Sequence, residues 1–190
     1  MKIDWLKINA LVPCQDAETG GNFTRVLLSG VGEIVEKRRV AGVIRAMGIH
    51  FQVDQVAVRK WAGEYLGKKK WLPLVFHREL ALVPLRLRRS PFRDAGATGY
   101  INLIRVAGCT QAQVPGYLSE IQFKDGSILP CLNAKGYVQR MLRQAGQVRE
   151  RYLLLHHGPV QGEDGLLPPE LLDDAKGWII VIPRQGRNFS

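Results

Sequence analysis

Residues 117–144 read YLSEIQFKDGSILPCLNAKGYVQRMLRQ, and this stretch decides the fold. Two apolar runs, Tyr117–Phe123 and Ser127–Leu132, flank Lys124-Asp125-Gly126. Asp-Gly between two such runs predicts a β-hairpin, because both residues tolerate the left-handed backbone of a tight turn. Asn133 is a suitable N-cap for a helix from Ala134 to about Gln144. Together with a strand predicted just upstream, over residues 100–106, this gives a strand-hairpin-helix unit.

Further upstream the apolar spacing becomes helical. Glu33–Met47 and Asp54–Leu66 carry apolar residues every three or four positions, which predicts two helices. Asp54 is a candidate N-cap for the second helix, and Gly67 a candidate stop. Before them, Phe23–Leu28 predicts a strand.

Two more strands are predicted between the helices and the hairpin, over Trp71–Phe76 and Glu79–Leu87. Pro73 and Pro84 cannot donate to a β-ladder, so we expect edge positions or strand starts for them. The fold expected is α+β, a mainly antiparallel sheet with the strand-hairpin-helix unit and N-terminal helices. We expect residues 1–155 to form one domain and residues 156–190 a C-terminal extension.

The charge of the chain is concentrated in its middle third. Residues 37–105 hold 15 basic and 4 acidic residues, a net charge of +11, whereas all 190 residues together have a net charge of +10. A concentrated cationic field attracts polyanions and speeds their encounter, and nucleic acid is the commonest such partner. A solvated basic surface without a partner is the alternative.

Basic side chains in two clusters are the candidate contacts to nucleic acid. Alternation along the strand places Arg86 and Arg88 on one face and Leu85 and Leu87 on the other, which predicts a cationic face with a buried reverse. Asn102 could reach a base edge, although Asn is also common at bulges and turns. The candidate DNA-binding residues are Lys68, Lys69, Lys70, Arg86, Arg88, Arg89, Arg93 and Asn102. Of these, the lysines, Arg88 and Arg93 would contact phosphates, and Arg86, Arg89 and Asn102 a groove.

Enzyme and cofactor motifs are missing from the sequence. It has no Cys-x-x-Cys, no His-Glu-x-x-His and no glycine-rich phosphate loop, so we expect neither an enzyme, nor a metal site, nor a cofactor. The three cysteines are widely spaced, which fits a reducing cytosol better than a disulfide framework. No apolar run approaches the length of a membrane span, and the N-terminus lacks a signal-peptide core. We therefore expect a cytoplasmic protein without a membrane partner.

The order of motifs in the central half resembles the competence transcription factor (ComK) family. Trp61–Lys69 is similar to the family's Gly-x-x-Tyr-x-Gly-Arg-Lys segment, one residue shorter, and Pro73 and Pro84 stand where the family has prolines in its next two strands. Tyr100–Ile104 resembles the aromatic strand opening, and Ile121–Cys131 the hairpin. The final helix is similar over residues 137–152, with Arg140, Arg143, Arg149 and Arg151 in its arginine-rich part. Two departures are the helical pattern over residues 29–60, where the family has more strand, and residues 158–190.

The resemblance implies a transcription activator that binds A/T-rich double-stranded DNA through the minor groove, as a homodimer or higher oligomer. Two other functions stay open at this point. An RNA-binding or ribosome-associated module would prefer single strands or hairpins, and aromatic side chains on the cationic surface would favour it. A metal-dependent nuclease would need clustered carboxylates, of which the basic third has few.

Overall fold

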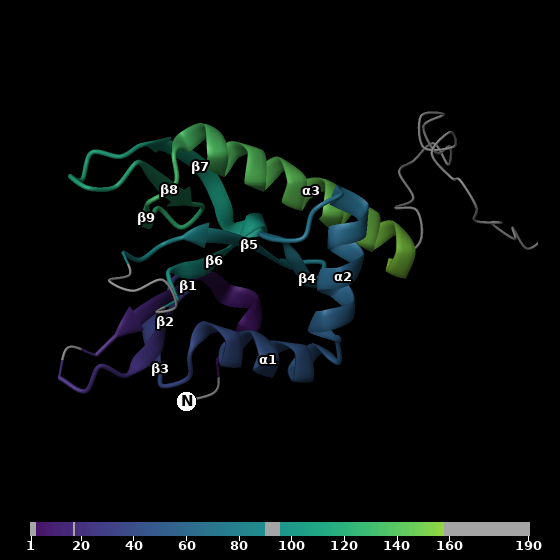
Figure 1. The fold of residues 1–190 in the computed structure, drawn as a ribbon, viewed down its shortest axis with the longest axis horizontal. Coiled ribbons are helices and arrows are strands. Elements are labelled where there is room, and N and C mark those ends of the chain that lie inside the picture. The colour runs from purple at the N-terminus through teal and green to yellow at the C-terminus, as the bar shows by residue number, and fades with distance from the viewer. Residues whose placement is uncertain (1–2, 17, 90–95, 158–190) are drawn as a thin grey trace, which may run out of the picture.

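The computed structural model describes residues 3–16, 18–89 and 96–157. It has three layers: helix α1, a six-stranded sheet, and a layer made of a three-stranded sheet and helix α3 (Figure 1). The helices are α1 (Val40–Phe51), α2 (Gln55–Leu66) and α3 (Lys135–His157), with 3₁₀ turns η1 (Trp5–Lys7) and η2 (Leu103–Arg105). The strands are β1 (Ile8–Gln15), β2 (Asn22–Leu28), β3 (Gly32–Glu36), β4 (Leu74–His77), β5 (Leu80–Arg86), β6 (Thr98–Asn102), β7 (Val106–Gln111), β8 (Ser119–Phe123) and β9 (Ile128–Cys131).

Every strand pair is antiparallel, so the predicted α+β class with a mainly antiparallel sheet is confirmed. The large sheet has the order β3-β2-β1-β6-β5-β4, and the small sheet β7-β8-β9. β6 follows β5 in the sequence and lies between β1 and β5 in the sheet. The predicted strand-hairpin-helix unit is present as β7, the β8–β9 hairpin and α3, but β6 belongs to the large sheet.

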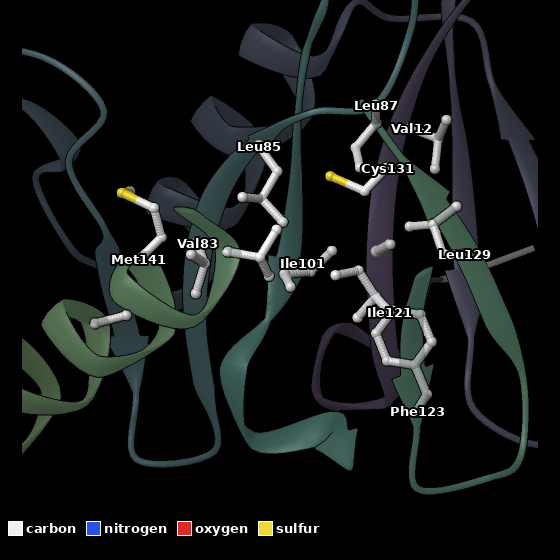
Figure 2. Close-up of a cluster of buried hydrophobic side chains, with 13 residues drawn as sticks. Val12, Val83, Leu85, Leu87, Ile101, Ile121, Phe123, Leu129, Cys131 and Met141 are labelled. Atoms are coloured by element: carbon white, nitrogen blue, oxygen red, sulfur yellow. The ribbon is translucent and has the colours of Figure 1, made fainter. Parts of the chain in front are cut away.

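The central strands of the large sheet are buried on both faces, whereas β3 at its edge is largely exposed. Leu11, Met47 and Leu82 belong to the cluster beneath α1. The opposite face packs against the β8–β9 hairpin and α3, and Figure 2 shows Met141 of α3 beside Val83, with Ile121 gathered near Ile101. Each such fully buried side chain contributes about 1.5–3 kcal/mol. The sheet is therefore the middle of a continuous sandwich.

β5 is the central element of this sandwich. Its residues from Leu80 to Leu85 are all buried, alternately toward the two clusters, and only Arg86 at its end is exposed. The predicted alternation of Arg86 and Arg88 with Leu85 and Leu87 is present at the end of the strand, where both leucines are buried, Arg86 is exposed and Arg88 is half-buried, but no cationic face extends along β5. Pro84 is tolerated because the β4 pairing stops at Leu82, so β5 is locally an edge at the proline.

α2 agrees with its predicted boundaries and caps. Asp54 Oδ1 accepts hydrogen bonds from Val56 N–H at 2.8 Å and Ala57 N–H at 3.3 Å. Gly67 ends the helix with a φ of 64°, in the left-handed region that glycine adopts at low cost. The N-cap and C-cap residues in the sequence were sufficient to predict this helix.

Three boundaries differ from the prediction. Residues 32–36 form β3, not the start of a helix, because they pair with β2, and α1 begins only at Val40. The strand predicted over residues 100–106 is broken at Asn102, which caps η2. α3 continues past Gly146 because Val148 and Tyr152 extend its buried face against Ala62 of α2.

Asn102 joins four parts of the chain at the centre of the large sheet. Its side chain is fully buried. Its Oδ1 accepts hydrogen bonds from Ala81 N–H at 3.2 Å and Ile104 N–H at 3.3 Å, and its Nδ2 donates to Ile8 O at 3.2 Å and Glu79 O at 3.0 Å. Its amide thus ties β1, β5, the β4–β5 turn and η2 together.

Replacement of Asn102 by alanine should lower the free energy of unfolding by about 2–4 kcal/mol, because buried backbone groups lose their partners. Urea unfolding followed by circular dichroism measures this loss. Gln139→Ala, on the exposed face of α3, is the matched control and should change the free energy by less than about 0.5 kcal/mol. Equal stability of the two variants would contradict the assigned role of Asn102.

Candidate nucleic-acid interface

Basic segments that are distant in sequence meet at one end of the large sheet. The register pairs Gln15 with Asn22, Thr24 with Glu36 and Arg86 with Thr98. The C-terminal ends of β1, β3 and β5 and the N-terminal ends of β2 and β6 therefore share this end, on the left in Figure 1. The cationic residues that follow β3 and β5 both lie at this end, four strand positions or about 19 Å apart.

The arginines after β5 are presented by a fixed backbone. Arg86 N–H donates to Asn133 Oδ1 at 2.7 Å, and Leu132 N–H donates to Arg86 O at 2.9 Å. These bonds join β5 to the end of β9, so Asn133 serves this junction with its side-chain oxygen rather than capping α3 as predicted. The Arg86 side chain is left exposed at the sheet end.

Arg88 and Arg89 are held by neutral groups. Arg88 donates from Nη1 to Asn22 Oδ1 at 3.0 Å and from Nη2 to Gln15 Oε1 at 2.7 Å. Arg89 Nη2 donates to Gly116 O at 2.6 Å. In the described part of the chain neither arginine pairs with a carboxylate, so both keep their full positive charge.

The run Lys37-Arg38-Arg39 joins these arginines from β3, and the sequence analysis did not single it out. Arg38 is paired with Glu36, at 2.9 Å between Nη2 and Oε2. Arg39 is the exposed N-cap residue of α1 and makes no side-chain capping bond. Lys37 and Arg39 are in no ion pair among residues 3–16, 18–89 and 96–157. The consecutive basic residues were the signal that could have found this segment.

A cavity of about 480 Å³ lies beside Arg39, between the sheet end, α1 and α2. Arg39 and Arg59 line it together with Asn22, Thr98 and Tyr100, and none of the described lining residues is Asp or Glu. Burial raises the pKa of the Tyr100 hydroxyl, and the hydrogen bond and charge of Arg59 partly oppose this rise. The hydroxyl is therefore neutral and shares a cationic cavity.

A groove of about 870 Å³ lies on the other face of the sheet, between β1–β3 and the β8–β9 hairpin. Arg88 and Arg89 line it near the sheet end, and Asn9 and Asp125 line it toward the start of β1. Asn9 Nδ2 donates to Asp125 Oδ2 at 2.7 Å, which fastens the hairpin turn to β1. The pKa of Asp125 is lowered to about 2, mainly by the Ser127 hydroxyl, with Asn9 and Ser29 also donating.

The lysine cluster lies elsewhere. Lys68 Nζ donates to Gln144 Oε1 of α3 at 2.6 Å, at the C-terminal end of α2. Arg59, near the other end of α2, lines the cavity at the sheet end. Arg59 and Lys68 are nine residues apart, about 14 Å along the helix, so Lys68, Lys69 and Lys70 lie on the α3 side of the molecule and not at the end of the sheet.

Asn102 and Arg93 are the two remaining predicted DNA-binding residues. Asn102 is fully buried with its amide bonded on all sides, so the expectation that it reaches a base edge is wrong. Arg93 lies outside the described residues, as do residues 158–190 of the expected C-terminal extension.

Metal sites and membrane-spanning helices are two other features that bear on function. No three His, Cys, Asp or Glu side chains there are placed to hold a metal ion. No described helix has both the length and the apolar character needed to cross a bilayer. No family model matches the chain, and neither a curated protein nor a solved structure matches it.

Asp125→Asn should destabilise the protein near neutral pH but not near pH 2. The folded pKa of about 2 lies below the usual value of 3.8, so the ionised carboxylate stabilises the fold above about pH 4. This contribution is lost as the pH falls from 4 toward 2. Thermal unfolding of both proteins between pH 2 and 7 measures the difference, and a difference that does not shrink toward pH 2 would contradict this assignment.

Proposed function

We propose that this protein binds A/T-rich duplex DNA through the end of its large sheet and regulates transcription. The observation that carries the proposal is that cationic side chains from three segments, 37–39, α2 and 86–89, lie at that end, and that among the described residues only Arg38 of them pairs with a carboxylate. We name this set the sheet-end surface. Its members are Lys37, Arg39, Arg59, Arg86, Arg88 and Arg89.

The chemistry of these side chains suits a polyphosphate. Arginine presents a planar fork of donors that matches phosphate oxygens, and it remains charged at every physiological pH. Each cation that neutralises a phosphate releases condensed counterions, which supplies sequence-independent affinity. The tethered Arg88 suits a phosphate contact, and Arg86 and Arg89 are the candidates for groove contact.

The regulatory part of the proposal rests on the resemblance to the competence transcription factor family. That resemblance also implies A/T-rich sites, minor-groove entry and a homodimer or higher oligomer. Basic side chains favour a narrow A-tract minor groove because its potential is strongly negative. The sheet-end surface supplies arginines for such an entry.

The double variant Arg39→Gln/Arg86→Gln should weaken binding to every duplex sequence, about tenfold or more at low salt. The slope of log K against log salt should fall by about one for each lost phosphate contact. Fluorescence anisotropy titrations at several salt concentrations measure both values, with A/T-rich duplex, G/C-rich duplex and an RNA hairpin as ligands. We expect the A/T-rich duplex to bind best.

The matched control is Lys7→Gln/Lys124→Gln. It removes the same charge near the start of β1, since Lys7 precedes β1 and Lys124 lies in the turn that is fastened to Asn9. Equal losses in the two double variants would reject the sheet-end surface. Tighter binding of the RNA hairpin would favour the RNA-binding module, and EDTA-sensitive degradation of a plasmid would favour the nuclease.

A further inference from the structure

Trp71 occupies an unusual position at the end of the lysine cluster. Its φ is 59°, one of only two positive values at non-glycine residues in the described chain. A bulky residue in this left-handed region is strained, and such strain concentrates at functional positions. The side chain is 37% exposed, although an indole placed for packing alone would be covered.

The indole of Trp71 has no aromatic partner among the described residues. Trp61, by contrast, stacks on Tyr65 with the ring centres 6.1 Å apart and meets the edge of Tyr152 at 6.4 Å. No described cation lies over the Trp71 ring either. Trp61 is thus part of the packing between α2 and α3, whereas Trp71 is partly exposed and has no aromatic or cationic partner among the described residues.

Basic side chains surround Trp71 from two elements. Lys69 and Lys70 directly precede it and are exposed. Lys68 is bonded to Gln144, which places the loop against the middle of α3. Lys68 and Trp71 are three residues apart, so at most about 11 Å of chain separates them.

α3 adds its own cations beside this loop. Arg140 precedes Gln144 by one helical turn, and its guanidinium lies over the Tyr137 ring, 5.2 Å from the ring centre. Arg140 and Arg143 are exposed, and neither is in an ion pair among the described residues. Of the charged residues in α3, five are basic and Glu150 alone is acidic.

We propose that Trp71, Lys69, Lys70, Arg140 and Arg143 form a second site, which binds single-stranded nucleic acid. An unpaired base stacks on the exposed indole, and the adjacent phosphates contact the lysines and arginines. Aromatic rings set among cations are the common way to bind single strands, because every base offers a π-face. In a duplex the bases are stacked on each other and are not open to the indole.

The single-strand site and the sheet-end surface are centred on opposite ends of α2. Lys68 follows the C-terminal end of this helix and is nine residues, about 14 Å, from Arg59. Arg140 lies between the two sites, because it follows Asn133, the partner of the Arg86 backbone, by seven residues. Trp71 is therefore the residue whose replacement tests the second site alone, and failure of duplex binding at the sheet end would leave its stacking role untouched.

The test compares Trp71→Leu with Trp71→Phe in the full-length chain. Both substitutions keep an apolar side chain and the same backbone strain, but only phenylalanine keeps a ring. Anisotropy titrations with labelled dT12 and rU12 should show about 5- to 100-fold weaker binding for Trp71→Leu and a loss of less than about threefold for Trp71→Phe. Lys69→Gln/Lys70→Gln should lower the salt slope by about 0.7 for each lost phosphate contact.

Three comparisons make the result decisive. Duplex binding should be unchanged in Trp71→Leu, and thermal unfolding should show that the variant is folded. Single-strand binding should be unchanged in Lys7→Gln/Lys124→Gln. Unchanged affinity of folded Trp71→Leu, an equal loss in Lys7→Gln/Lys124→Gln, or no binding of either oligomer would overturn the proposal. The ratio of dT12 to rU12 affinity distinguishes a DNA from an RNA ligand.

Discussion

Burial of β5 on both faces is the constraint on which the rest of the structure depends. A strand covered by α1 on one side and by α3 with the small sheet on the other cannot carry a charge within its length, because an unpaired buried charge costs several kcal/mol. Its arginines can therefore occur only where the sandwich ends. The same constraint applies to β1, whose first six residues are buried. The cationic surface lies at an end of the sheet, not on a face, for this reason.

Hydrogen bonds between distant segments then fix the geometry of that end. The Arg86 backbone is bonded to the first two residues after β9, and the Arg88 side chain joins the end of β1 to the start of β2. Inside the sheet, the side chain of Asn102 likewise joins distant segments by hydrogen bonds. Polar side chains whose partners are more than twenty residues away in sequence thus set where the functional groups lie.

Local signals in the sequence predicted the local elements well. Asp125-Gly126 identified the β8–β9 hairpin, and Asp54 with Gly67 identified α2, because turns and caps depend on residues a few positions apart. β1, β3 and β7 were missed or assigned to helix, because their strand conformation depends on partners elsewhere in the chain. The length of α3 was underestimated because its second half is held by contacts to α2.

The candidate site could be predicted only in part. Clustered charge indicated the third of the chain that supplies the cations at the sheet end, including the arginines that follow β5. It could not show that Lys68–Lys70 lie with α3 while the segment 37–39 lies with the arginines, because this depends on the sheet order β3-β2-β1-β6-β5-β4. Nor could it show that the buried side chain of Asn102 makes all its hydrogen bonds to the backbone. Aromatic exposure at Trp71 likewise follows from a backbone angle that composition does not reveal.

The neutral partners of Arg88 have a kinetic consequence. An arginine held by a carboxylate must break an ion pair before it can accept a phosphate, and that step adds to the activation barrier for association. The amide oxygens of Gln15 and Asn22 orient the guanidinium without cancelling its charge. In the proposed complex with DNA, a guanidinium that these two bonds already order has less side-chain motion to lose on binding. The long-range attraction that steers the approach is also undiminished.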